Sequence, residues 1–412
     1  MYDELYTSVP EEYEQVKRGV HEFSKEVLKP AALALDKLPA QEAMESRIYW
    51  DVMRKGYELG YHKVLLPEEY GGLGLDPLGV HILLEELGWG SSGLAISLAV
   101  SAFPAMGTCI FGAENQDAID RFVMPFVEDS KARFIGCWAI TEPNHGSDWL
   151  MAHKLEDPSI KGSLRAVQKG NTWVLNGQKS SWVSNGPVAT HALLFPMIKP
   201  EIGMKGGGIC VVPLSEVKGV SKAKPLEKMG QRALPQGEIF FEDAEIPGEW
   251  MIVDDEEVYP FAVEAVLATA NAGMGAIFTG LARAAFEEAL SYARMRVQGG
   301  KLLIEHQLIQ HKLFEMFRRS ETARYYSRAA LIYNLSTMPP KTRYSITAKT
   351  YCTEAAFLNA HDAIQIFGGL GISKESSIEM LLRDAKLSMI EDGCNEALGI
   401  SAALDFHELD LD

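Results

Sequence analysis

The stretch Met380–Glu396 reads MLLRDAKLSMIEDGCNE and leads from a helical pattern into a tight turn. Apolar residues recur at helical spacing through residues 377–390, which predicts a helix. Asp392-Gly393 then follows, a dipeptide that out of context is typical of a turn. The C-terminal part of the chain is therefore expected to be helical up to a turn that presents one carboxylate.

The pattern upstream of this turn predicts further long helices. Residues 261–298 contain no Pro and much Ala, and Gly299-Gly300 ends the pattern. Residues 306–337, stopped by Pro339-Pro340, and residues 343–367 read as two more helices. Four long helices with short connections predict a helical bundle.

The middle of the chain has a different pattern. Between Phe134 and Trp250, short apolar runs alternate with turn signals, among them Asn176-Gly177 and Asn185-Gly186. This pattern predicts a β barrel or sandwich.

The first part reads as helical, with residues 11–28 closed by Pro30 and residues 116–124 ended by Pro125. We therefore expect an α+β multidomain fold, with a helical domain over 1–135, a β domain over 136–252 and a four-helix bundle over 253–412.

Composition limits the function classes. The 412 residues are 47% apolar and 23% charged, which is ordinary for a globular protein, and the formal charge is -17. Such an acidic chain is a poor binder of nucleic-acid backbones, so we expect no nucleic-acid partner. Five cysteines without a CxxC pair indicate free thiols in a reducing compartment; they are Cys109, Cys137, Cys210, Cys352 and Cys394.

Membrane and targeting signals are weak. The uncharged run Leu87–Ala113 is interrupted by many Gly and Ser residues, which favours a buried helix over a membrane span. The first residues, MYDELYTSVPEEYEQ, lack an apolar core, so we expect no signal or transit peptide and a cytoplasmic protein.

Two motifs in the β region complete the pattern. CWAITEPNHGSD occupies Cys137–Asp148, and WVSNG occupies Trp182–Gly186. Together with the C-terminal segment, and with the order helices, β domain, four-helix bundle, they resemble the acyl-CoA dehydrogenase family over nearly the whole chain. The resemblance implies an FAD enzyme that removes the α-proton of an acyl-CoA thioester while a β-hydride passes to flavin N5. The base in that family is usually a Glu, and Asp392 holds its place here.

The resemblance also implies two groups of cofactor-binding residues and no metal site. One group would surround the flavin ring: Trp138, Ile140, Thr141, Gly146, Ser147, Trp182, Ser184 and Cys394. The other would reach the FAD of a neighbouring subunit: Arg296, Gln298, Gln307, Gln365 and Gly369. Cofactor binding then needs at least a dimer, and a homotetramer is expected. Lys228–Pro247 would form closing strands of the β domain, and Arg383-Asp384 a structural ion pair or cap.

Residues expected at the substrate are Ser91, Ser147 and Gly393, whose backbone N–H would meet the thioester carbonyl. Asp in place of Glu withdraws the carboxylate by ~1.5 Å, while intrinsic basicity barely changes. A branched or cyclic α-carbon suits a shorter base, and the loop Gly90–Gly93 offers no other acid. Cyclohexane-1-carbonyl-CoA is the preferred substrate hypothesis, with an electron-transfer flavoprotein as the acceptor.

The chain departs from the family pattern at several positions. Gly299 replaces an aromatic residue, Cys394 and Leu398 replace a Thr and a Gln near the cofactor, and Asn271 stands where many members have Arg. The arrangement around that Arg therefore cannot be transferred to this chain.

Two alternatives remain open. Nitroalkane oxidases share this fold and use an Asp at the corresponding position, and would pass electrons to oxygen. A non-catalytic, nucleic-acid-associated member of the fold is the other alternative, which the acidic charge and the retained carboxylate disfavour.

Overall fold

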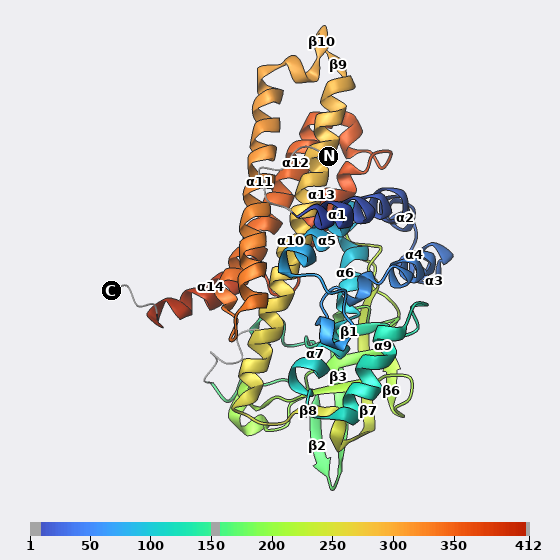
Figure 1. The fold of residues 1–412 in the computed structure, drawn as a ribbon, viewed down its shortest axis with the longest axis vertical. Helices are drawn as coiled ribbons and strands as arrows, with labels where there is room; N and C mark the ends of the chain where they lie inside the picture. Colours follow the sequence, from blue (N-terminus) through green and yellow to red (C-terminus); the bar gives the residue numbers. More distant parts are fainter. Residues whose placement is uncertain (1–9, 150–156, 409–412) are drawn as a thin grey trace.

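The computed structural model describes residues 10–149 and 157–408. Helices come first along the chain, followed by two sheets and then a second set of helices, which confirms the predicted α+β architecture (Figure 1). The sheets lie at one end of the elongated molecule, and the long C-terminal helices extend away from them to the opposite end.

Nine short to medium helices make up the described N-terminal part: α1 (Glu11–Phe23), α2 (Lys29–Leu35), α3 (Ala40–Glu45), α4 (Arg47–Glu58), α5 (Pro77–Gly90), α6 (Ser92–Val100), α7 (Phe103–Phe111), α8 (Gln116–Ala118) and α9 (Met124–Glu128). The uncharged run predicted to be buried falls in α5, α6 and α7, and nearly all of its side chains are inaccessible to solvent.

Two prolines do not end helices where the sequence pattern predicted. Pro30 lies in the first turn of α2, and Pro125 in the first turn of α9. A π-helical turn precedes each proline, at Ser24–Leu28 and at Ile119–Val123. A wider turn shifts the backbone hydrogen-bond pattern, so that a residue without an N–H is accommodated and the helical path continues.

The middle part is a sandwich of two four-stranded sheets. One sheet has the order β1 (Gly136–Ala139), β4 (His191–Leu194), β5 (Ile209–Pro213), β8 (Met251–Val253), with β1 and β4 parallel. The other is antiparallel, with the order β2 (Arg165–Lys169), β3 (Thr172–Ser184), β7 (Gln236–Pro247), β6 (Val220–Lys222). Inward-facing side chains of both sheets form one apolar core.

Only one of the two Asn-Gly dipeptides is a turn between elements. Asn185-Gly186 follows β3 as predicted, and Asn185 adopts a φ of 62°. Asn176-Gly177 instead lies inside β3, where the pairing with β7 shifts register and Gly177 has a φ of 133°. The prediction of a turn there was wrong, because the glycine serves a β-bulge in a long strand.

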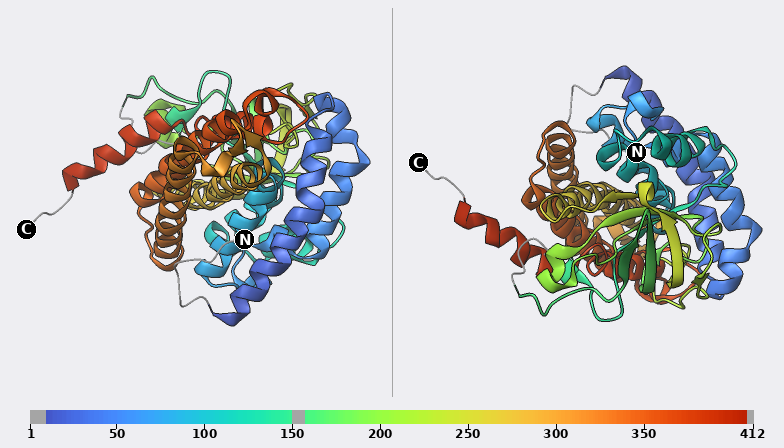
Figure 2. Two further views of the ribbon diagram at one scale, coloured as in Figure 1. Left: turned by 90° about the horizontal axis from the view of Figure 1, so that it is seen from above. Right: turned by 90° about the horizontal axis from the view of Figure 1, so that it is seen from below.

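The C-terminal part contains α10 (Val258–Met295), α11 (Gln307–Ser336), α12 (Thr342–Phe367) and α13 (Ile378–Ser388). A two-stranded hairpin, β9 (Val297–Gln298) and β10 (Lys301–Leu302), joins α10 to α11. A further helix that was not predicted, α14 (Asn395–Leu404), projects from the body (Figures 1 and 2). Helix α10 meets the length and hydropathy of a membrane span, but 72% of its most apolar window is buried, as in a core helix.

Glycines allow α5 to approach α10 closely. A Cβ at Gly88 would lie 2.1 Å from the carbonyl oxygen of Ile277, and one at Gly280 would lie 2.0 Å from that of Glu85. Larger residues at these positions would force the helices apart, and the loop after α5 would move with them.

Candidate active site

The site is built around the turn that follows α13. Asp392 has a φ of 50° and Gly393 a φ of 93°, so two successive residues are left-handed. Glycine adopts this conformation freely and Asp tolerates it, whereas most side chains do not. The turn therefore directs the chain sharply from α13 into α14 and leaves the Asp392 side chain at its apex.

Two buried residues of the helical bundle hold the turn in place. Lys349 of α12 is fully buried, and its Nζ donates to the Gly393 carbonyl at 2.7 Å and to Asn395 Oδ1 at 2.8 Å. Asn271 of α10 donates from Nδ2 to the Asp392 carbonyl at 3.4 Å. Asn271, which stands where many family members have Arg, thus contacts the turn through the backbone carbonyl of Asp392.

Ser147 reaches the same turn from the β domain. Its Oγ accepts a hydrogen bond from the Cys394 backbone N–H at 3.0 Å. The two motifs that are far apart in the sequence are therefore adjacent in space. The Gly393 N–H, by contrast, donates no hydrogen bond to the residues the structure describes, so it is available to a ligand.

The Asp392 carboxylate is half-buried and accepts no hydrogen bond from residues 10–149 and 157–408. Neither of its oxygens is sealed off from solvent, since neither appears among the buried atoms that lack a partner. Burial raises the pKa of Asp392 to about 6, and the charge of Lys349 limits that rise. An unshielded carboxylate with this pKa is mostly ionised at neutral pH and is suited to accept a proton.

Other titratable groups surround this base. Burial and the charge of Asp392 raise the pKa of Glu391 to about 7, and burial raises that of Asp384 to about 7. Burial lowers the pKa values of Lys228 and Lys349 to about 8. Perturbed pKa values of this kind cluster at functional sites.

Asp384 does not pair with Arg383, so that prediction was wrong. Arg383 points the other way and binds both carboxylate oxygens of Asp36, at 2.9 and 2.7 Å, as well as Glu379. Asp384 Oδ1 instead accepts the backbone N–H of Gln231 at 2.5 Å. Adjacent residues on a helix face different directions, which separates the two side chains.

The predicted substrate residue Ser91 caps α6. Its Oγ accepts from the Leu94 N–H at 3.3 Å, and the side chain is buried. The following turn lies beside the segment after β6, since a Cβ at Gly93 would be 3.6 Å from Gln231 Cα. Gln231 in turn donates from Nε2 to Glu391. The loop Gly90–Gly93 is thereby linked to the base turn through Gln231.

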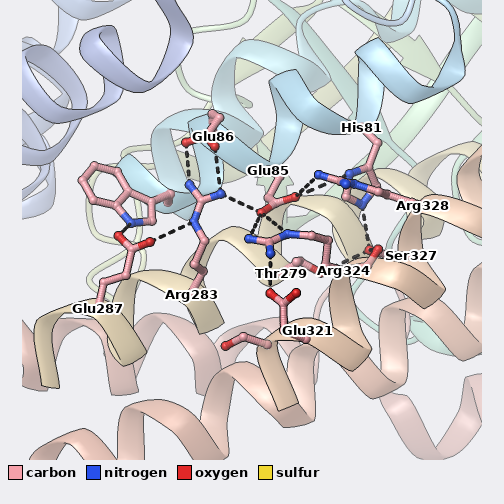
Figure 3. Close-up of polar contacts among 12 residues, drawn as sticks. His81, Glu85, Glu86, Thr279, Arg283, Glu287, Glu321, Arg324, Ser327 and Arg328 are labelled. Carbon is pink, nitrogen blue, oxygen red and sulfur yellow. Dashed lines mark hydrogen bonds and ion pairs between the residues drawn. The ribbon is translucent and has the colours of Figure 1, made fainter. Parts of the chain in front are cut away.

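An ion cluster fixes the helix that carries this loop (Figure 3). Glu85 and Glu86 of α5 both bind Arg283 of α10, at 2.7 and 2.5 Å. Glu85 also binds Arg324 of α11 at 3.0 Å. Burial alone would raise the pKa of Glu85, but the charges of Arg324, Arg283 and Arg328 hold it well below its usual range. Two charged residues next to the Gly-rich loop thus hold α5 against α10 and α11.

The predicted flavin-ring residues fall into two environments. Trp138 is buried and stacked on Phe103 with ring centroids 5.5 Å apart, and Ile140 is buried as well. Trp182 is 59% exposed on β3, and Ser184 on the same strand accepts from Gln236 at 3.0 Å. Thr141 and Ser147 are half-buried, and nothing lies within 4 Å of a Cβ built at Gly146. An exposed Trp beside polar groups and an open glycine fits the planar ring of a flavin.

The second predicted group lies at the far end of the bundle. Arg296 and Gln298 form the tip after α10, and Gln307 begins α11. Gln365 and Gly369 adjoin them, because Phe367 stacks on Tyr292 with centroids 4.2 Å apart. All five are exposed, and the 38 residues of α10, about 57 Å of helix, separate them from the sheets (Figure 1). Within one chain the two predicted groups are therefore far apart.

The sequence analysis missed Lys349, Gln231, Glu391 and Lys228. Lys349 lies on the buried face of α12 among Ala348, Cys352 and Ala356, and a lysine in an apolar stripe was the available signal. Gln231 has a φ of 46° and gave no signal, because nothing in its sequence neighbourhood predicts contact with residues 384 and 391.

Comparisons with known proteins identify the family of this chain. Family models for the N-terminal, middle and C-terminal domains of acyl-CoA dehydrogenases match residues 10–124, 137–244 and 261–403. The rat mitochondrial short-chain specific acyl-CoA dehydrogenase is 32% identical over 95% of this chain and 90% of its own length. The solved glutaryl-CoA dehydrogenase in complex with glutaryl-CoA is 26% identical, with a TM-score of 0.86 over 98% of both chains.

An active-site mutant of nitroalkane oxidase crystallised with 1-nitrooctane has the same fold. Its TM-score is 0.88 over 99% of this chain and 98% of its own, at 22% identity.

Proposed function

The chain belongs to the acyl-CoA dehydrogenase family of FAD-dependent oxidoreductases, and we propose that Asp392 is the base with which it dehydrogenates a cyclic or branched acyl-CoA. The observation that carries this proposal is the Asp392 carboxylate, which is half-buried, open to solvent and free of hydrogen bonds from the described residues. A carboxylate without a structural partner is otherwise hard to account for at the apex of a turn anchored by three other residues.

Gly393 and Asp392 would have separate roles in the proposed dehydrogenation. The Gly393 N–H, which has no partner among the described residues, would donate to the thioester carbonyl and acidify the α-carbon. Asp392 would accept the α-proton, and the electron pair of that C–H bond would form the new double bond as the β-hydride leaves. Bound FAD supplies the hydride acceptor, and Trp182, Ser184, Thr141 and Ser147 are the residues that would hold its ring.

Lys349 would hold the Gly393 N–H in place and keep the Asp392 carboxylate ionised. It anchors the Gly393 carbonyl, so the N–H at the opposite side of the same residue points in a fixed direction. Its charge also keeps Asp392 ionised at neutral pH. Lys349 touches the backbone of the turn, so we class it as a positioning residue.

The substrate class follows from geometry. An Asp carboxylate lies ~1.5 Å further back than a Glu carboxylate on the same backbone, and an α-carbon held in a ring or branch presents its hydrogen differently. Cyclohexane-1-carbonyl-CoA is the reference substrate of this proposal. Anaerobic mixing with linear, branched and cyclic acyl-CoAs, followed by the bleaching of flavin absorbance, tests it.

Variants of Asp392 separate the role of the base from binding. Asp392→Asn should retain FAD and lose reduction by every thioester. Asp392→Glu should shift preference toward straight-chain thioesters. Turnover by the Asn variant would assign the base elsewhere, and the same substrate order in wild type and the Glu variant would refute the geometric argument.

A nitroalkane-oxidizing enzyme is the second candidate. The active-site mutant crystallised with 1-nitrooctane shares the fold over 99% of this chain, and an Asp at the base position suits both reactions. Bleaching by nitroethane but not by acyl-CoA thioesters, with reoxidation by oxygen, would favour this candidate.

We also propose a homotetramer and an electron-transfer flavoprotein as the acceptor. The second cofactor group lies at the tip after α10, away from the base turn that contacts Asn271, so a second copy would supply Arg296 and its neighbours. An outward hollow on α11 of about 720 Å³, lined largely by aromatic residues, offers a surface for such a copy; it is formed by Phe317, Glu321, Thr322, Tyr325, Tyr326 and Ala329. Sedimentation tests the assembly, and anaerobic transfer to a purified electron-transfer flavoprotein tests the acceptor.

A further inference from the structure

Glu391, the residue before the proposed base, has an unusual environment. It is half-buried and appears in no ion pair within the described chain. One oxygen, Oε1, accepts from Gln231 Nε2, while Oε2 accepts nothing and is not sealed off from solvent. Carboxylates are seldom buried without a cation, and one that keeps an open oxygen has unused capacity to accept a hydrogen bond.

Lys228 does not provide the missing partner. Its Nζ donates to the Leu234 carbonyl and to Gln236 Oε1, both at 2.8 Å. Its charge acts on Glu391 from a distance, but it forms no salt bridge with it. The other nearby cation, Lys349, is bound to Gly393 and Asn395.

Gln231 adds a second open acceptor. Only 1% of this residue is exposed, its Nε2 faces Glu391, and its Oε1 is buried without a hydrogen-bond partner. The amide nitrogen of Gln231 donates to Glu391, so its oxygen faces away from that carboxylate. Two acceptors without a donor therefore lie together, and leaving a buried acceptor unpaired costs free energy.

The place of these acceptors points to the acyl group. Glu391 and Asp392 are consecutive, about 3.8 Å apart at Cα, and the charge of Asp392 acts on Glu391. If Asp392 meets the α-carbon, a group that meets Glu391 lies a few bonds away on the acyl moiety. The loop Gly90–Gly93 borders Gln231, since a Cβ at Gly93 would lie 3.6 Å from Gln231 Cα.

We propose that Glu391, positioned by Gln231, recognises a hydrogen-bond donor on the acyl group, so that the substrate is a hydroxyl- or amine-bearing cyclic acyl thioester. The proposal rests on the proposed function, because it takes Asp392 as the base. A terminal carboxylate is excluded on the same grounds: Asp384, Glu391 and Asp392 outnumber Lys228 and Lys349, and the open oxygens repel an anion.

The experiment compares thioesters with rings of one size in the FAD-loaded full-length protein. The probes are cyclohexane-1-carbonyl-CoA, 4-hydroxycyclohexane-1-carbonyl-CoA, piperidine-4-carbonyl-CoA and 4-carboxycyclohexane-1-carbonyl-CoA. We measure anaerobic flavin reduction and, with the unreactive thioether analogues, dissociation constants from the flavin spectrum. At least one donor-bearing probe should reduce the flavin about tenfold faster than the hydrocarbon probe and bind with a dissociation constant about tenfold lower, and the carboxylate probe should reduce slowest and bind weakest.

The donor-to-hydrocarbon ratio is the rate of flavin reduction with the better donor-bearing probe divided by the rate with cyclohexane-1-carbonyl-CoA. Glu391→Met should bring this ratio close to one while reduction by the hydrocarbon probe persists. Glu391→Gln, which keeps the side-chain shape, should give an intermediate ratio and guards against misfolding of the Met variant. Glu396→Met, on the exposed face of the next helix, removes the same charge and should leave the ratio unchanged.

The outcomes separate the two proposals. A wild-type ratio near one, or a ratio unaffected by Glu391→Met, overturns the role of Glu391 even if the flavin is reduced. Failure of every thioester to reduce the flavin, or reduction by Asp392→Asn, overturns the proposed function itself.

Discussion

Replacing Lys349 with methionine should move the pH dependence of flavin reduction to higher pH. In the wild-type protein the pKa of Asp392 is about 6, raised by burial and restrained by Lys349. The ionised fraction of the base is then about 10% at pH 5, 50% at pH 6 and 90% at pH 7. The rate of reduction should therefore rise about fivefold between pH 5 and pH 6 and level off above pH 7.

The sign of the Lys349→Met effect follows from charge. A nearby cation stabilises the carboxylate, so its loss lets burial raise the pKa of Asp392 further above 6. A rise of one unit, about 1.36 kcal/mol, would reduce the ionised fraction at pH 6 from about one half to about one tenth. Fold stability should fall as well, because two hydrogen bonds from a charged donor are lost.

The assay is stopped-flow flavin reduction from pH 5 to pH 9, with folding checked by near-ultraviolet circular dichroism. Lys374→Met removes the same charge from an exposed position and serves as the matched control. An unchanged midpoint in the Lys349 variant, or a shift to lower pH, would refute the reasoning. An equal shift in the control would attribute the effect to net charge.

Three further predictions follow from the positions of single side chains. Arg283→Met leaves two buried carboxylates short of a partner and should lower the unfolding free energy by about 3–5 kcal/mol in urea titrations, whereas exposed Arg318→Met should change it little. Trp182→Ala removes a 59% exposed ring and should weaken FAD retention, measured by ultrafiltration, while the melting temperature of the apoprotein stays unchanged. Arg296→Ala should weaken FAD retention more than Arg294→Ala, although both arginines are exposed, because only the first begins the hairpin at the bundle tip; equal losses would argue against a role for Arg296.

The order of helices and sheets was predictable because it depends on local pattern. Apolar residues at helical spacing in runs without Pro gave α10 to α13 within a few residues, since a continuous apolar face is decided along the helix itself. The errors arose where distant partners decide the outcome. Pro30 and Pro125 continue helices through π turns, and Asn176-Gly177 is absorbed into a bulge by pairing with β7.

The residues of the site show the same contrast: local motifs predicted some of them, and distant contacts determine the others. Asp392 and Ser147 were singled out from motifs, and Ser147 accepts a hydrogen bond from Cys394, two residues after Asp392. Lys349 and Gln231 contribute through hydrogen bonds to residues 44 and 160 positions away, and no local pattern encodes these. Buried polar residues become interpretable only when the groups that satisfy them are known.

The pKa that makes Asp392 a base also makes the folded protein less stable at neutral pH. The folded pKa of about 6 exceeds the ordinary value of 3.8, so the folded state binds this proton more tightly than the unfolded state. Stability therefore falls as pH rises between these two values, by at most about 3 kcal/mol and by less for a half-buried group. Asp392→Asn removes the titration and should unfold at higher urea concentration than wild type at pH 7, with a smaller gain at pH 5. If the variant is no more stable at pH 7, the carboxylate is not held at a cost in the folded state, and its raised pKa cannot be the basis of its function.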